Sequence, residues 1–228
     1  MTTGPIEDLE WPTRIRARVV EPGAAPRVHG FDVQSDLARH YRFGETILIA
    51  LTGEAPDEAT GRAFEVAMIF GSAISVLEAP AHAAMLSRVC GARPSGIEAV
   101  AATTLAERAR SIYDELEPAI PRLLVGSLNG MAPRLAPRST TERDAVGRLR
   151  TALGAFASRV PALGYDLSLD AAILAVLLAC GLRNREPIEC ALCVAGIAAT
   201  CAEAFAATPG DHRSYPIDLP KFVYEDRS

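Results

Sequence analysis

Apolar residues recur every three or four positions along most of the chain, which is the spacing of one buried face of a helix. Asp57 and Ser139 stand just before such stretches, where N-cap residues are expected, and Ser139 to Glu142 matches a capping box. Two helices are expected between Ser35 and Pro56, and the pattern predicts six more, over 57–70, 80–90, 95–116, 139–160, 168–179 and 187–207. The hydrophobic pattern therefore predicts an all-α protein.

Three segments interrupt the helical pattern. Residues 11–33 are broken by three prolines and carry short β-branched pieces, which predicts an extended lead-in with about two short strands. Residues 118–138 hold four prolines and predict a connector, and residues 208–228 predict a nonhelical tail. Helices are thus expected on both sides of a single proline-rich connection.

The helix expected over 187–207 is rich in Ala, Gly, Cys and Thr. Small side chains let helix backbones approach one another closely. We therefore expect this helix to be fully buried or to lie in a subunit interface.

The composition is that of an ordinary globular protein. The chain has 228 residues, of which 49% are hydrophobic and 22% charged, enough for one large domain or two unequal ones. The net charge is −5 and no dense Lys/Arg stripe is present, so nucleic-acid binding is not expected.

A membrane span is not expected either. The longest apolar run, Leu169–Leu182, contains Asp170 and is shorter than the roughly 20 residues that span a bilayer. The first ten residues carry three acidic side chains and no apolar core, so no signal peptide is expected. The five irregularly spaced cysteines indicate a reduced, cytoplasmic protein. Cys190 and Cys193 form a CxxC without nearby further ligands, and packing is favoured over a metal or redox role.

Several phrases, in their order along the chain, resemble the citrate synthase superfamily, in particular short citrate synthases and citryl-CoA lyase-like proteins. They are the turn at 28–32 (VHGFD), the run at 47–56 (ILIALTGEAP), the segments 80–84 (PAHAA) and 167–170 (LSLD), and Gly196 in a late helix. The resemblance covers most of the chain. It implies a citrate synthase-like large helical domain with a truncated small domain and a short β-containing N-terminal segment.

The resemblance also implies a division of the chain. Residues 1–33 form the extended N-terminal segment, 34–104 and 161–228 form the large helical domain and its tail, and 105–160 are the remnant of the small domain. Only 21 residues separate Arg108 from Asn129, the positions that match the family's two histidine loops. Most of the mobile small domain is therefore expected to be missing.

The family is known for joining or cleaving a carbon–carbon bond between an acyl-CoA and a keto acid. This chemistry requires a carboxylate base, one histidine that stabilises the enol, and another that polarises the acceptor carbonyl. Asp170 matches the base. The two histidine positions fall on Arg108, inside a charged helical stretch, and on Asn129. In the late helix, Cys193 and Thr200 stand where the family has its arginine and its histidine.

Each candidate residue also has a structural interpretation. Asp170 near a helix start interacts favourably with the helix dipole, which explains it without catalysis. His82, among Ala and Met, is interpreted as a satisfied, partly buried side chain, and Arg108 as part of a solvated helix face. Against these stand the functional hypotheses: Asp170 as catalytic base, with His82, Arg108 and Asn129 as substrate-binding residues. No metal site is expected.

The missing imidazoles predict a noncatalytic citrate synthase-like subunit, forming a homodimer or a heterodimer with a citrate synthase-like paralogue. One alternative is a divergent enzyme that uses Asp170 to form or cleave a carbon–carbon bond, with a CoA thioester as its ligand. The other is a sensor of small carboxylates or CoA esters. No resident cofactor is expected in any of the three.

Overall fold

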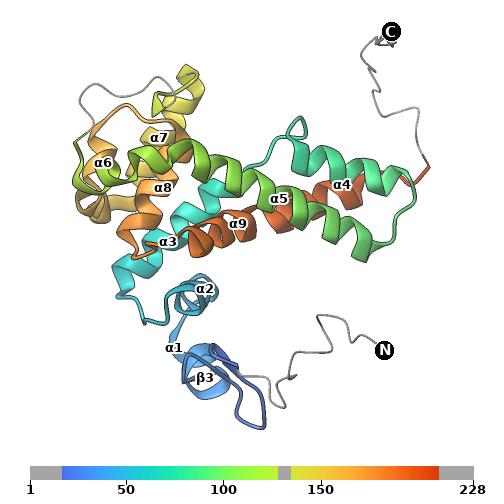
Figure 1. Ribbon diagram of the computed structural model, residues 1–228, viewed down its shortest axis with the longest axis horizontal. Coiled ribbons are helices and arrows are strands. Elements are labelled where there is room, and N and C mark those ends of the chain that lie inside the picture. Colours follow the sequence, from blue (N-terminus) through green and yellow to red (C-terminus); the bar gives the residue numbers. More distant parts are fainter. Residues whose placement is uncertain (1–16, 128–134, 211–228) are drawn as a thin grey trace, which may run out of the picture.

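The computed structural model describes residues 17–127 and 135–210, and helices dominate these residues (Figure 1). The long helices are α2 (Phe43–Thr52), α3 (Glu58–Gly71), α4 (Ala79–Val89), α5 (Pro94–Leu116), α7 (Thr140–Leu153), α8 (Leu169–Ala179) and α9 (Arg185–Ala206). Short helical pieces lie between them: α1 (Ala38–His40), η2 (Glu117–Ala119), α6 (Ile120–Val125), η4 (Gly154–Arg159) and η5 (Pro161–Gly164). The all-α class is confirmed.

The described part of the N-terminal segment forms a small antiparallel meander. Its strands β1 (Val20–Glu21), β2 (Arg27–Val28) and β3 (Phe31–Asp32) pair in sequence order, one strand more than the sequence predicted. A π-helical turn, η1 (Val33–Leu37), follows, because the Asp32 side chain accepts hydrogen bonds from two backbone N–H groups of that turn. The meander lies against the end of α2, where the Nε2 of His29 is 3.2 Å from the carbonyl oxygen of Ala50.

One large apolar core joins α3, the second half of α5, α6, α7, α8 and the first turns of α9. The helix α8 lies at its centre: every residue from Ala171 to Leu178 is buried. Such a helix has no polar face because neighbours cover it on all sides. Its first turn therefore has a fixed position, and Asp170 belongs to that turn.

The helices α4 and α9 and the first half of α5 extend from this core on one side of the molecule (Figure 1). A second, smaller core holds them together and consists of Ala84, Ile97, Ala101, Cys201 and Ala204. Small side chains allow this close packing, as they do where α9 crosses α5. A Cβ atom added at Gly196 would lie 2.8 Å from a methyl carbon of Leu105. The helix is buried on this face only, since Val194 and Phe205 are exposed, so the expectation of a fully buried helix is wrong and that of a subunit interface stays a prediction.

Several predicted boundaries need correction. The connector expected over 118–138 contains the helix α6, which follows η2 and buries Leu123. The helix expected over 139–160 ends at Leu153, where Gly154 adopts a positive φ of 54° and 3-10 turns follow. The prolines of 118–138 suggested a connector, but a proline in the first turn of a helix is compatible with that helix.

The helix α9 is long and apolar enough to cross a membrane, with a mean hydropathy of 1.7 and 39% of its apolar window buried. It packs along α5, α4 and α3. The predicted division at 34–104, 105–160 and 161–228 stays a prediction. Side chains from all three of these segments share the large core.

Candidate functional site

An open cleft of about 1120 Å³ lies between the start of α4, the middle of α5, and the first turns of α7 and α8. Three arginines and five carboxylates line it, which are Glu78, Glu107, Arg108, Glu115, Arg138, Glu142, Arg148 and Asp170. The lining is therefore rich in charged groups, and these include two of the residues singled out from the sequence, Arg108 and Asp170.

Asp170 is the second residue of α8, and its position follows from how that helix begins. Ser168 is the N-cap, and its hydroxyl accepts a hydrogen bond from the backbone N–H of Ala171 at 3.3 Å. Burial raises the pKa of Asp170 above its ordinary value, because desolvation outweighs the attraction of Arg108 and Arg138. Its side chain keeps 34% exposure toward the cleft. Asp170 also stands in the first turn of α8, where a carboxylate interacts favourably with the helix dipole.

Arg108 connects Asp170 to a carboxylate that the sequence did not single out. The Nε of Arg108 donates to Oε2 of Glu78 at 2.6 Å, whereas its Nη2 is 3.8 Å from Oδ1 of Asp170. The first distance is a charge-assisted hydrogen bond, and the second is too long for a hydrogen bond. Arg108 therefore pairs with Glu78 more closely than with Asp170. Its side chain is 24% exposed, so it is not part of a fully solvated helix face.

Glu142 joins the starts of α7 and α8 on the far wall of the cleft. The expected capping box is half formed: the hydroxyl of Ser139 accepts from the Glu142 backbone N–H at 3.1 Å. The carboxylate of Glu142 does not return to the N-cap. It accepts instead from the backbone N–H groups of Arg138, at 2.6 Å, and Leu169, at 3.0 Å. This carboxylate fixes the residue that immediately precedes Asp170.

The structure does not bring His82 to the cleft lining. His82 lies on an exposed face of α4, so the expectation of a partly buried side chain is wrong. His29 and His40 belong to the N-terminal part and do not line the cleft either. Asn129 lies outside the described residues. Within 17–127 and 135–210, the cleft around Asp170 thus has no imidazole in its lining.

The late-helix positions are internal or solvent-exposed. The Sγ of Cys193 donates to the carbonyl of Ala102 at 3.7 Å, and Thr200 is 1% exposed. Glu203, one turn further along α9, is exposed. These three side chains do not line the cleft, as far as its described walls extend. The two positions that match the family's arginine and histidine thus hold the uncharged side chains of Cys193 and Thr200.

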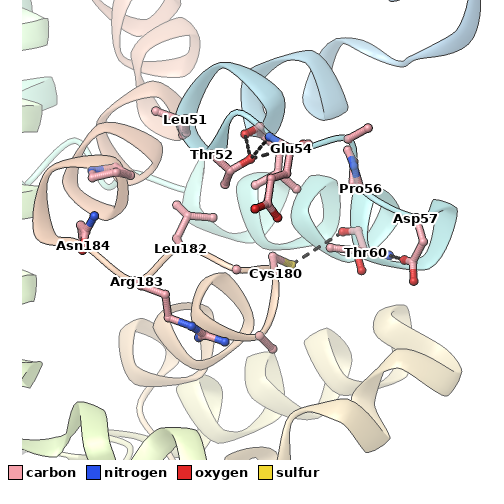
Figure 2. Close-up of a pocket in the computed structure, with 15 residues that line it drawn as sticks. Leu51, Thr52, Glu54, Pro56, Asp57, Thr60, Cys180, Leu182, Arg183 and Asn184 are labelled. Carbon is pink, nitrogen blue, oxygen red and sulfur yellow. Dashed lines mark hydrogen bonds between the residues drawn. The ribbon is translucent and has the colours of Figure 1, made fainter. Parts of the chain in front are cut away.

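A second hollow of about 490 Å³ lies where the end of α2, the start of α3 and the end of α8 meet (Figure 2). Several of its polar groups are engaged within the protein. The Sγ of Cys180 donates to the carbonyl of Thr60 at 3.7 Å, and Oδ1 of Asp57 accepts from the Thr60 backbone N–H at 2.6 Å. Arg183 donates to the carbonyl of Leu178. These contacts cap and join helices, so this hollow is structural.

Comparison with solved structures identifies the fold. The chain is similar to citryl-CoA lyase from Hydrogenobacter thermophilus, at 17% identity over 94% of this chain and 97% of that chain, with a TM-score of 0.64. The chain therefore has an all-α, citrate synthase-like fold. No protein-family model and no curated protein matches the sequence.

Two ATP citrate lyases also match this chain in fold. The Methanothrix soehngenii enzyme, solved with citrate and coenzyme A, is 14% identical over 98% of this chain, with a TM-score of 0.64. A variant of the Methanosaeta concilii enzyme, solved with (3S)-citryl-CoA, is 14% identical over 95% of this chain, with a TM-score of 0.59. The match spans only 43% of each of those chains.

The match covers nearly all of both chains, so this protein and the citryl-CoA lyase are similar in length. Because that protein is described as a citryl-CoA lyase, the short length of the present chain is no argument by itself against catalysis. The case against catalysis therefore depends on the side chains in the cleft.

Glu78 is the site residue that sequence reasoning missed. It is 30 positions from Arg108 and no motif links the two. Its position immediately before the Pro80 helix start is the only local signal, and that signal indicates an N-cap rather than an ion pair. Long-range pairing of this kind depends on how α4 packs against α5.

Proposed function

We propose that this chain is a noncatalytic citrate synthase-like subunit that serves as a structural or regulatory partner of a second citrate synthase-like chain. The observation that supports this most is the identity of the side chain beside Asp170. Where the family resemblance requires an enol-stabilising histidine, Arg108 binds Glu78. A guanidinium stays protonated throughout the physiological range, so it cannot exchange a proton as an imidazole does.

A purified sample tests this directly. We expect neither cleavage of citryl-CoA nor condensation of acetyl-CoA with oxaloacetate above the background of an Asp170→Asn variant. Loss of one catalytic group commonly reduces rates by a hundredfold or more, and here two imidazoles are replaced. Turnover at an enzyme-like rate that disappears in the Asp170→Asn variant refutes the proposal.

The partner surface that we propose is the outer face of α9 with the adjoining face of α4. Val194 and Phe205 of α9 and Leu86 of α4 are exposed apolar side chains. Soluble proteins rarely leave large contiguous apolar areas uncovered. Whether the second chain is identical or a paralogue is left open, and symmetric pairing of identical chains is the simplest arrangement.

Sedimentation equilibrium tests the surface. We expect Val194→Arg to weaken association at least about tenfold, because a charge at the centre of an apolar interface is left without a partner. The matched control is Val125→Arg, at an exposed apolar position of α6. The proposed surface is wrong if both variants associate as strongly as the unmodified chain, alone and with a citrate synthase-like paralogue.

A divergent enzyme that acts on an acyl-CoA remains the second candidate, and the raised pKa of Asp170 favours it. Perturbed carboxyl groups in clefts are common among catalytic bases. The turnover assay with Asp170→Asn decides between the two candidates. For either one we propose a cytoplasmic location, which the five free cysteines support.

A further inference from the structure

Arg108 already binds a carboxylate of the same chain, that of Glu78. Oε2 of Glu78 accepts from the Nε of Arg108 at 2.6 Å, and Oε1 accepts from the backbone N–H of Ser75 at 3.0 Å. The two oxygens of one carboxylate thus meet two donors from different elements. One donor is Arg108 of α5, and the other is the backbone N–H of Ser75, in the segment that precedes α4. Together they form a receptor for a carboxylate group.

The same edge of the guanidinium carries a second donor. The Nε and Nη2 of an arginine are one of the donor pairs that a carboxylate can bind in bidentate fashion. In this cleft Nη2 is 3.8 Å from Asp170, which is beyond hydrogen-bonding distance. Glu78 therefore uses half of the pair, and an incoming carboxylate could use both halves if Glu78 moved away.

Glu78 contributes little to the helix in which it stands. It is the N-cap residue of α4, but its side chain makes no capping hydrogen bond to that helix. Its side chain is 37% exposed and lines the cleft of about 1120 Å³. The carboxylate can thus leave its position without breaking a helix cap, and the cleft has room for a small organic acid.

We propose that Ser75 and Arg108 form a latent binding site for small carboxylates, which Glu78 occupies in the resting protein. A tethered group competes at a high effective concentration, commonly about millimolar or above. The apparent affinity for a free carboxylate falls by the fraction of time for which the site is vacant. This site lies in the cleft that we propose to be noncatalytic. It rests on that proposal in one respect, which is that the protein does not convert the bound acid.

Calorimetric titration with succinate tests the latent site. Glu78→Ser shortens the side chain and places a favourable N-cap residue at the start of α4, so the variant is expected to keep the fold. If Arg108 is vacant no more than about a tenth of the time, succinate should bind this variant at least tenfold more tightly than the unmodified chain. The double variant Glu78→Ser with Arg108→Gln should lose that gain.

The matched control is Glu107→Ala. Glu107 lines the same cleft and pairs with Arg110 at 3.9 Å, so its removal changes the charge of the cleft without vacating Arg108. We expect no gain in affinity for this control. Glu78→Ala serves as a second vacating variant if Glu78→Ser lowers the melting temperature.

Three results overturn the latent site: a gain below tenfold in a folded Glu78 variant, an equal gain in Glu107→Ala, or a gain that persists in the double variant. None of them bears on turnover. The citryl-CoA assay on the unmodified chain tests the proposed function separately, so the two proposals fail independently.

Discussion

Asp170 is the residue on which both functional hypotheses depend, and its environment has a measurable consequence. Its folded-state pKa is raised by burial, so the folded protein holds that proton at pH values where the unfolded chain has released it. Asp170 therefore makes its full contribution to the free energy of unfolding below the ordinary pKa of 3.8. That contribution is lost as pH rises through the raised pKa.

We expect Asp170→Asn to raise the free energy of unfolding at pH 7, and to raise it less at about pH 4, as urea titrations at both values can show. Asp166→Asn is the control, because Asp166 is an exposed carboxylate paired with Arg143 at 2.9 Å. Its removal should not stabilise the protein. Destabilisation of equal size at both pH values in Asp170→Asn contradicts the burial of this carboxyl.

Cys180 is the most strongly perturbed of the described thiols. Burial raises its pKa from 9.0 to about 12, which lowers its thiolate fraction at pH 8 by about a thousandfold. We expect iodoacetamide to label the exposed Cys90 and Cys190 of the folded protein and to spare Cys180. Mass spectrometry of the labelled peptides gives the answer. Labelling of Cys180 as fast as Cys190 is incompatible with the packing of α8 against α3.

At the scale of elements, the crossing of α2 and α3 depends on the absence of side chains at two glycines. A Cβ atom at Gly61 would lie 2.3 Å from Oε1 of Glu45, a buried carboxylate that also accepts from the Arg42 backbone N–H at 2.7 Å. A Cβ atom at Gly44 would lie 2.4 Å from Cγ of Glu65. The two helices therefore approach more closely than side chains usually permit.

We expect Gly61→Ala to destabilise the protein by about 1–3 kcal/mol, because the buried Glu45 has little room to move aside. In a chain of this size this corresponds to a fall of roughly 2–12 °C in melting temperature. Gly147→Ala in α7 is the control, since a Cβ atom added there would meet nothing within 4 Å and alanine favours the helix by up to about 1 kcal/mol. Similar melting temperatures for both variants disagree with the close crossing.

The elements themselves were largely predictable because their signals are local. Asp57 caps α3 through the Thr60 backbone N–H, and Ser139 caps α7, both as expected from the sequence. Glu142 shows where local reasoning ends. Its carboxylate reaches Leu169, 27 positions away, instead of the N-cap that the capping-box pattern names. Such a choice depends on which helix start lies nearby in the folded chain.

At the scale of the whole molecule, the family resemblance predicted the architecture, and the comparison with citryl-CoA lyase confirmed it. The candidate site was predictable only in part. The fold brings Arg108 and Asp170 into one cleft, as the resemblance implied, and it leaves His82 on an exposed face of α4. Glu78 could not be found from the sequence, because its role arises from the packing of α4 beside α5.

The proposed noncatalytic role is most directly tested by proton exchange. Acetyl-CoA is incubated with the protein in D2O, with and without oxaloacetate, and the incorporation of deuterium into its methyl group is followed by NMR. We expect no exchange above that of buffer or of the Asp170→Asn variant, because no imidazole lines the described walls of the cleft to stabilise an enol. Exchange that the unmodified chain catalyses and Asp170→Asn does not contradicts a noncatalytic role.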